Sequence, residues 1–492
     1  MAYLPLDIPS GVFNHGTELE SAGRWRDVNL VRWQNNSLRP IGGWNTRVSA
    51  AASGAPRGAI SWSTNSGDSW IGFGNYQALY AVSSSGTVTN ITPTGFTTGY
   101  EDAVELIGYG NKAYGTSSYG VARPTNGVFQ SCTSWSLDNW GEYLIGCSSD
   151  DGKIYEWQLN VANPAAVVTN APVNNSAIMV TAERFLFALG AGGNPRKVAW
   201  SDRENNTDWT ATSLNEAGDI ELQTSGKIMC GLQIRGRALI ITNTDAHVAT
   251  YQGPPYVYGF ERAGTACGTI SRMSAAAVDT GAFWMGSNGF FMYNGSTVQE
   301  MPCDVADYVF SNISATQKSK VFAVHNSSFG EVWWFYPSGS SLENDRYVVY
   351  DYKENHWNIG TLSRTAGIDY GVFTKPIWFD ASANIYNQET GMNHGGVKPY
   401  AETGPISLGA GDNVMRVTGL VSDELTFGEA TFTFKTRFHP NDTERTYGPY
   451  SVANPKGVRM TGRQVRVKIE GDDLKDWRVG KQRLSVVQGG KR

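Results

Sequence analysis

The stretch SWIGFGNYQALYAV (69–82) contains two short apolar strands that meet at a turn containing Asn75. The same pattern returns in EYLIGCSSDDGKIYEW (142–157) and in FWMGSNGFFMY (283–293), where an Asp-Gly or Asn-Gly pair separates the strands. Such pairs supply the positive φ angles that tight hairpins need. The chain is therefore predicted to be all-β and built from short antiparallel hairpins.

These hairpins recur along the chain at a similar spacing. The steps between their central residues run from 36 (Trp70 to Leu106) to 54 (Phe185 to Leu239) residues. A period of about 40–50 residues with four short strands per repeat is typical of a β-propeller. Because the first two steps are short, we expect six or seven blades. Helical periodicity is clear only in CDVADYVFSNIS (303–314).

The pattern changes beyond the hairpin repeats. Around residues 388–412 the chain is rich in Gly, Pro and polar residues and has no periodicity, as expected of a linker. The later stretches ATFTFKTRF (430–438) and RQVRVKIE (463–470) alternate apolar and polar residues, which favours a half-buried antiparallel sheet. The predicted organisation is an N-terminal extended segment (1–50), a β-propeller (51–390), a linker (391–412) and a C-terminal β-sandwich (413–492).

Composition excludes several classes of protein. The 40 Lys and Arg residues against 45 Asp and Glu residues give a formal charge of −5, which does not suggest a nucleic-acid binder. The sequence contains no run of 18 apolar residues, so no membrane-spanning helix is predicted. Its first residues lack the pattern of a secretory signal. Five widely spaced cysteines are expected to be reduced and buried, and six scattered histidines show no metal-ligand spacing. We expect no metal and no cofactor.

Motifs of catalysis are also missing. The sequence has no G-x-S-x-G elbow and no Walker motif. Propellers can host glycosidases, which need two carboxyl groups about 5–10 Å apart. The candidate carboxylates are Asp202, Glu204, Asp245, Asp304, Asp351 and Glu354. Acidic residues in propeller turns usually cap strands, so we predict no catalytic residue, and His356 is interpreted as a structural histidine. No motif joins Arg184, Arg237 and Arg346 into a carboxylate-binding cluster.

Two further patterns have both a structural and a functional interpretation. In EVWWFY (331–336), alternation places Trp333 and Phe335 on one face and Trp334 and Tyr336 on the other. Packing against the two neighbouring blades is favoured over a sugar- or base-stacking platform.

The second pattern is the basic face formed by Arg463, Arg466 and Lys468. It could be a solvated strand face, a docking face for an acidic neighbour or a contact with DNA. The first of these interpretations is favoured, because Glu470, Asp472 and Asp473 follow directly. We keep the three basic residues as a possible docking face.

Several stretches resemble the tail proteins of short-tailed bacteriophages, in particular the propeller-containing nozzle or hub family. The opening resembles that family's start, with Val31-Arg32-Trp33 before Gly42-Gly43-Trp44. Residues 135–157, the stretch 307–366 and the ending DWRVGKQRLSVVQGGKR (476–492) are also similar to it. The resemblance covers both ends and the middle of the chain. It does not extend to residues 93–134 and 370–430.

The resemblance implies a structural virion protein without enzymatic activity. Its copies would form a ring, expected to be a hexamer, that extends the DNA-ejection channel below the portal and the tail adaptor and can also gate it. The implied partners are the ring itself, the adaptor and portal complex, the tail fibres or tailspikes, and phage DNA in transit without sequence-specific binding. The protein would be made in the cytoplasm of the bacterial host and located in the virion tail.

The charge distribution along the chain predicts what would line the channel. Residues 1–400 carry 25 basic and 34 acidic side chains (−9), whereas residues 401–492 carry 15 and 11 (+4). A basic lumen would hold DNA tightly and slow its passage, so we expect a lumen lined by acidic or neutral residues. Two alternatives remain open: a propeller-based tail component that binds or cleaves glycans, and a cytosolic propeller scaffold with no virion role.

Overall fold

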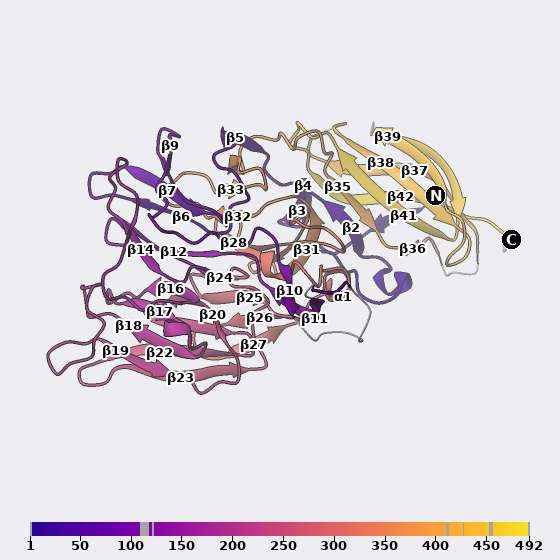
Figure 1. Cartoon of the computed structure of the whole chain (residues 1–492). Helices are drawn as coiled ribbons and strands as arrows, with labels where there is room; N and C mark the ends of the chain where they lie inside the picture. Colours follow the sequence, from indigo (N-terminus) through magenta and orange to yellow (C-terminus); the bar gives the residue numbers. More distant parts are fainter. Residues whose placement is uncertain are drawn as a thin grey trace.

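The computed structural model describes residues 2–108, 118–120, 123–409, 413–426, 428–451 and 456–490. Within them the chain is almost wholly β. The described helical elements are short: α1 (Ala306–Phe310) and the 3-10 turns η1 (Glu18–Ser21), η2 (Ala191–Gly193) and η3 (Lys318–Lys320). Figure 1 shows two bodies side by side, a large one built from the middle of the chain and a smaller one that holds both chain ends.

The large body contains seven four-stranded antiparallel sheets, which we number as blades 1–7. Blades 1–3 are formed by β6 (Ala59–Ser63), β7 (Ser69–Gly74), β8 (Leu79–Ser83) and β9 (Val88–Asn90); by β12 (Trp135–Trp140), β13 (Tyr143–Ser148), β14 (Ile154–Trp157) and β15 (Ala166–Val167); and by β16 (Ala177–Val180), β17 (Leu186–Leu189), β18 (Lys197–Trp200) and β19 (Gly218–Glu221).

Blades 4–7 continue the series. They are formed by β20 (Ile228–Ile234), β21 (Arg237–Thr242), β22 (Asp245–Gly253) and β23 (Val257–Thr265); by β24 (Ala275–Val278), β25 (Gly281–Met285), β26 (Phe290–Tyr293) and β27 (Val298–Met301); by β28 (Phe322–Asn326), β29 (Glu331–Tyr336), β30 (Arg346–Asp351) and β31 (His356–Thr361); and by β32 (Ala366–Ile368), β33 (Ile377–Phe379), β34 (Ile385–Gln388) and β5 (Trp44–Val48).

The seven blades close into a ring. The first strand of each blade contacts the first strand of the next, and β32 of blade 7 contacts β6 of blade 1. Blade 7 takes its outer strand, β5, from the N-terminal part of the chain, so the two ends of the propeller are held in one sheet. In a closed ring of blades, the remaining sheet edges are short and protected. The predicted β-propeller is confirmed, with seven blades.

Aromatic side chains fill the spaces between blades. All of β29 is buried. The ring of Trp333 lies 5.2 Å from that of Trp378 in blade 7, and the ring of Trp334 lies 4.9 Å from that of Phe290 in blade 5. Such ring pairs add about 0.5–1.5 kcal/mol each to the free energy of burial. The interpretation of EVWWFY as packing on both faces is therefore confirmed.

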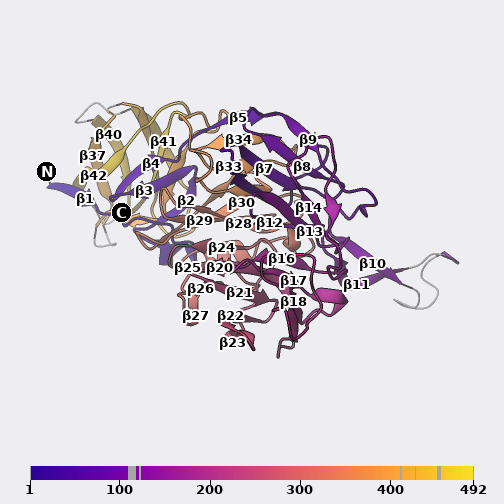
Figure 2. The ribbon, with the colours of Figure 1, turned by 90° about the vertical axis from the view of Figure 1, so that its left-hand side faces the viewer.

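Two segments between blades depart from the repeat. The hairpin of β10 (Val104–Gly108) and β11 (Arg123–Gln130) lies between blades 1 and 2 and projects from the propeller, as Figure 2 shows. The helix expected over 303–314 is shorter than predicted, since α1 covers only Ala306–Phe310. Val305 and Val309 are fully buried, so the apolar pattern reflects packing of a mostly irregular segment.

The smaller body is a sandwich of two six-stranded sheets. One sheet contains β1 (Ala2–Leu6), β3 (Val31–Gln34), β4 (Ser37–Pro40), β37 (Met415–Glu424), β40 (Lys456–Gly462) and β42 (Val479–Gln488). The other contains β2 (Trp25–Asn29), β35 (Tyr400–Thr403), β36 (Ile406–Ser407), β38 (Ala430–Arg437), β39 (Arg445–Ser451) and β41 (Gln464–Gly471). The expected C-terminal sandwich is present, and both chain ends build it.

The expected domain boundaries need correction at two places. Residues 1–50 are no separate extended segment, because β1–β4 pair within the sandwich and β5 completes blade 7. The expected linker, 391–412, contains β35 and β36, which pair with β41. Both differences have one cause. The strands pair with segments distant in the sequence, as β2 does with β35, β5 with β34 and β35 with β41, and such pairing leaves no local pattern.

The propeller and the sandwich share one apolar core. A single cluster of buried side chains includes Trp25 and Val31 from the N-terminal strands, Trp334 from blade 6 and Phe432 from the sandwich. The two bodies are therefore packed together as in the interior of one domain.

Candidate functional site

The predicted docking face lies on β41 and on Arg463 just before it, and its charged side chains have partners within the protein. Arg466 Nη2 lies 2.6 Å from Glu402 Oε1, and Arg466 Nη1 lies 3.4 Å from Glu18 and 3.3 Å from Glu444. Lys468 Nζ lies 2.5 Å from Glu470 Oε2. Arg463 Nη1 lies 3.4 Å from His439 Nδ1. Arg466 and Lys468 thus have acidic neighbours of their own, and the docking role of the three residues stays a prediction.

The candidate carboxylates are engaged in local structure. Asp351 Oδ1 accepts hydrogen bonds from the backbone N–H of Lys353 at 2.9 Å and of Glu354 at 2.8 Å, and thereby caps the turn after β30. Asp245 accepts hydrogen bonds from Thr242 and Thr224 at 2.6 and 2.7 Å. None of the six lines the two axial cavities described below.

The other residues weighed for catalysis are also dispersed. His356 is buried, and burial lowers its pKa, so its imidazole is neutral at pH 7. Arg184 lies over the Trp140 ring, Arg237 Nη1 donates to the carbonyl of Gly295, and Arg346 Nη1 donates to the hydroxyl of Tyr308. The structure therefore brings the three arginines to three separate places.

A charged cluster that the sequence did not predict lies at the junction of propeller and sandwich. Arg32 of β3 donates from Nε and Nη2 to the two carboxylate oxygens of Glu331, at 2.9 and 2.8 Å. It also donates from Nη1 and Nη2 to Glu389, at 3.0 and 2.6 Å. All three side chains are nearly inaccessible to solvent, with exposed fractions of 3–8%. One guanidinium thus joins the sandwich to blade 6 and to the end of blade 7.

The axis of the propeller holds a cavity of about 240 Å³. Its walls are the first strands of the blades and the residues just before them. Small side chains and backbone form much of this wall, for example Ala59, Ala177, Gly231, Ala275 and Gly367.

A second cavity, of about 590 Å³, lies at one mouth of this axis. We call it the axial mouth. Three cationic side chains line it, those of Lys227, Arg272 and Lys318, and its lining contains no Asp or Glu among the described residues. Arg272 lines both cavities. Burial and the positive charges of Arg272 and Lys318 lower the pKa of Lys227.

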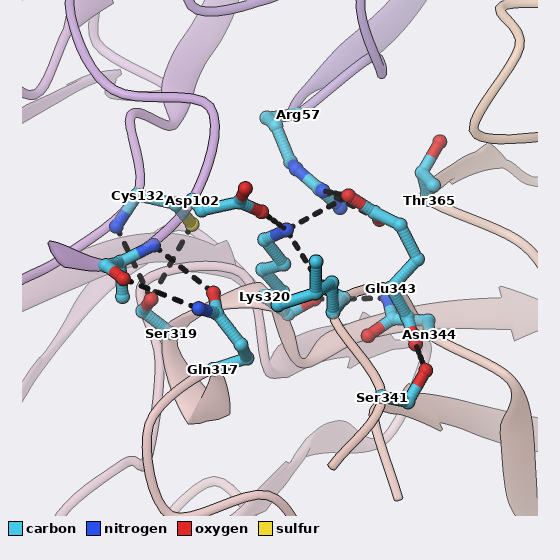
Figure 3. A network of polar contacts seen from close by, with 12 residues as sticks. Arg57, Asp102, Cys132, Gln317, Ser319, Lys320, Ser341, Glu343, Asn344 and Thr365 are labelled. Carbon is cyan, nitrogen blue, oxygen red and sulfur yellow. Dashed lines mark hydrogen bonds and ion pairs between the residues drawn. The ribbon is translucent and has the colours of Figure 1, made fainter.

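A polar network lies beside the axial mouth, as Figure 3 shows. Lys320, which is fully buried, places Nζ 2.5 Å from Asp102 Oδ1 and 2.8 Å from Glu343 Oε1. Glu343 also binds Arg57 at 2.6 Å. Gln317 exchanges two hydrogen bonds with the backbone of Ala103, at 3.0 and 3.2 Å. The network therefore ties blade 6 to blade 1 and to the base of the β10–β11 hairpin.

The cysteines show no sign of reactivity. All five are free, four are buried and Cys303 is partly buried, which agrees with the prediction. Burial raises the pKa of Cys147 and of Cys230 to about 12, so both thiols are protonated at neutral pH. The described residues contain no group of three or more His, Cys, Asp or Glu side chains arranged to hold a metal. No helix in the same residues has the length and apolarity to cross a membrane.

Sequence reasoning missed Arg32 and Arg272 for different reasons. Arg32 stands between Val31 and Trp33 in a strand, and a charge between two large apolar residues is a usable signal of a buried ion pair. Arg272 stands in an irregular segment between β23 and β24, and only the closed ring brings it near Lys227 and Lys318.

No family model and no curated protein matches the sequence. Among solved structures, virginiamycin B lyase from Staphylococcus aureus is similar with a TM-score of 0.43 and 8% identity, over 70% of this chain and 97% of that chain. The WD40 domain of Neurospora crassa Pan2 is similar with a TM-score of 0.39 and 9% identity, over 72% of this chain and 95% of that chain. The first of these is an enzyme, and a likeness of this degree carries no argument about activity.

Proposed function

We propose that this protein is a structural subunit of a short bacteriophage tail. Copies of it would form a ring that extends the DNA-ejection channel below the portal and adaptor. The proposal starts from the sequence resemblance, and one structural observation carries it further. Three of the resembling stretches, 8–44, 307–366 and 476–492, meet at the junction of propeller and sandwich.

Two contacts at the junction connect those stretches directly. Arg32, in the Val31-Arg32-Trp33 element of the opening, binds Glu331 in the middle stretch. Leu38 of the opening pairs with Val479 in the terminal stretch. Parts of three resembling stretches therefore help to hold the two bodies together. Such an arrangement suits a subunit whose work is mechanical.

The proposed mechanism needs shape and charge but no catalytic residue. Each subunit contributes a section of wall to the channel between the subunits of the ring. An acidic or neutral wall repels the phosphates and leaves the duplex free to slide, whereas a basic wall would bind it in a salt-dependent way. Glycan cleavage is not part of the proposal, because Asp351 caps a turn, Asp245 binds neighbouring threonines, and none of the six candidate carboxylates lines the axial cavities.

The decisive experiment is a cryo-EM map of purified phage particles in which this chain is located. The expected result is a ring of this chain directly below the adaptor, with a bore lined by acidic or neutral side chains. Absence of the chain from purified particles would overturn the proposal. Depolymerisation of host polysaccharide by the isolated protein would replace it with the glycan-active alternative. A bore lined with Lys and Arg would refute the repulsion mechanism.

A further inference from the structure

One cation beside the axial mouth and one that lines it have different surroundings. Lys320 is fully buried, and two carboxylates neutralise it. Arg272 is half-buried, and within the described residues it makes no ion pair and no hydrogen bond through its side chain. Burying part of a guanidinium without partners costs free energy, so proteins normally pair such groups. Among the described residues, then, no direct contact neutralises Arg272, and an anion in the axial mouth could do so.

The backbone holds Arg272 firmly in place. The hydroxyl of Ser271 contacts the carbonyl of Val321 and accepts a hydrogen bond from the backbone N–H of Met273 at 3.0 Å. Met273 in turn forms a bridge with Phe322 at the start of β28. Arg272 thus lies in a segment fixed to blade 6 on one side and continuous with blade 5 on the other. Its side chain lines the axial cavity and the axial mouth.

The surroundings of Arg272 favour an anion. Lys227 and Lys318 line the same mouth and are exposed at its rim, where they can reach a ligand. Neutral hydrogen-bonding groups complete the lining, among them Asn243, Thr269, Ser287, Thr316 and Ser319. The carboxylate of Asp150 attracts Arg272 from beyond ion-pair distance, and its own hydrogen bonds come from Thr133 and Gln130.

We propose that the axial mouth is a binding site for a phosphate group of a small molecule, held by Arg272 and flanked by Lys227 and Lys318. The planar guanidinium can donate two parallel hydrogen bonds to a phosphate, and the two ammonium groups supply additional charge. A cavity of about 590 Å³ is within the size range of small-ligand sites. The site belongs to a single subunit and does not rest on the proposed tail function.

The test is isothermal titration calorimetry of the full chain at low salt, with inorganic phosphate and with ATP as separate probes. Tight binding of phosphate alone would identify a free oxyanion as the ligand, and much tighter binding of ATP would identify a phosphorylated small molecule. Arg272→Gln should weaken binding of the preferred probe by roughly tenfold or more, because a hydrogen-bonded charge is removed. Lys227→Gln and Lys318→Gln should weaken it less, by about two- to fivefold each.

Two controls separate binding from folding. Arg203 is exposed in the loop after β18, outside the axial mouth, and Arg203→Gln removes the same charge there. This variant should bind like the original protein. In the absence of probe, Arg272→Gln should unfold at a similar temperature to the original protein, because the lost attraction to Asp150 is offset by the relieved repulsion of Lys227.

Several results would overturn the proposal. One is the absence of saturable binding of both probes. Others are equal binding by Arg272→Gln, or an equal loss in Arg203→Gln. Binding of a 20-base-pair DNA duplex that depends on Arg272 and excludes ATP would show that the mouth serves nucleic acid instead.

Discussion

Two charged clusters of this protein differ in how far apart their members lie in the sequence. The junction cluster joins Arg32 to Glu331 and Glu389, across 299 and 357 residues of chain. The turn cluster of blade 2 joins Asp151 to Lys153 and Tyr155, only two and four residues away, and to the backbone N–H of Thr97. The first cluster holds two bodies together, and the second stabilises one hairpin.

The two clusters also differ in their charge balance. At the junction one guanidinium faces two carboxylates in a site closed to water, so the arrangement depends on that single cation. Burial, together with the charge of Glu389, raises the pKa of Glu331 despite the presence of Arg32. In blade 2, Asp151 receives several hydrogen bonds from nearby groups, and each partner contributes part of its stabilisation. Loss of one residue should therefore cost more at the junction.

The largest expected effect is that of Arg32→Met. It leaves two buried carboxylates without a cation, which should lower the free energy of unfolding by about 3–5 kcal/mol. Urea unfolding of the full chain measures this loss. The matched control is Glu331→Gln, which leaves one carboxylate for one guanidinium and should cost much less. Equal losses in the two variants would contradict the dependence of the cluster on Arg32.

The stability of the Arg32→Met variant should depend on pH. Without Arg32, burial and the charge of Glu389 hold the pKa of Glu331 above its unfolded-state value. The protonated form of Glu331 then stabilises the fold at low pH, and this contribution is lost as the pH rises through the folded-state pKa. The gap in stability between the original protein and Arg32→Met should therefore narrow between pH 8 and pH 5.

A smaller effect is expected of Asp151→Asn. Burial opposes ionisation of Asp151, but hydrogen bonds from Tyr155, Thr97 and Lys153 outweigh it and lower the pKa. The substitution should cost about 1–3 kcal/mol at pH 7, since hydrogen bonds to a charged acceptor are lost. The lowered pKa stabilises the fold above the ordinary Asp value of about 3.9, and this contribution is lost as the pH falls through the folded-state value. The difference between the two proteins should shrink from pH 5 to pH 2.5, and a constant difference would contradict this account.

The contrast between the clusters also explains what could be predicted from the sequence. The Asp150-Asp151-Gly152 turn and the alternation of EVWWFY act within a few residues, so hairpins, blades and inter-blade packing followed from local patterns. The sandwich was expected from β38 and β41 alone. Its N-terminal strands were not, because β2 pairs with β35 and β4 with β42 across most of the chain.

The candidate site was less predictable for the same reason. Arg463, Arg466 and Lys468 were noticed because they lie close together near one strand. Their acidic partners Glu18 and Glu402 come from distant segments that no local pattern connects with β41. The axial mouth is assembled from residues of several blades, and only ring closure brings Lys227, Arg272 and Lys318 together.

The smallest expected effect distinguishes internal pairing from docking on β41. Arg466 shares Glu402 with Lys435, whose Nζ lies 2.8 Å from the same carboxylate. Arg466→Gln therefore leaves Glu402 with one cation and should cost only about 1 kcal/mol in urea unfolding. Lys481→Gln, which removes a fully solvated pair with Asp7, should change stability by less than about 0.5 kcal/mol. If Arg466→Gln also leaves the free energy of unfolding unchanged, Arg466 makes no net contribution to the stability of the fold. That result would favour the interpretation of this strand face as a docking surface.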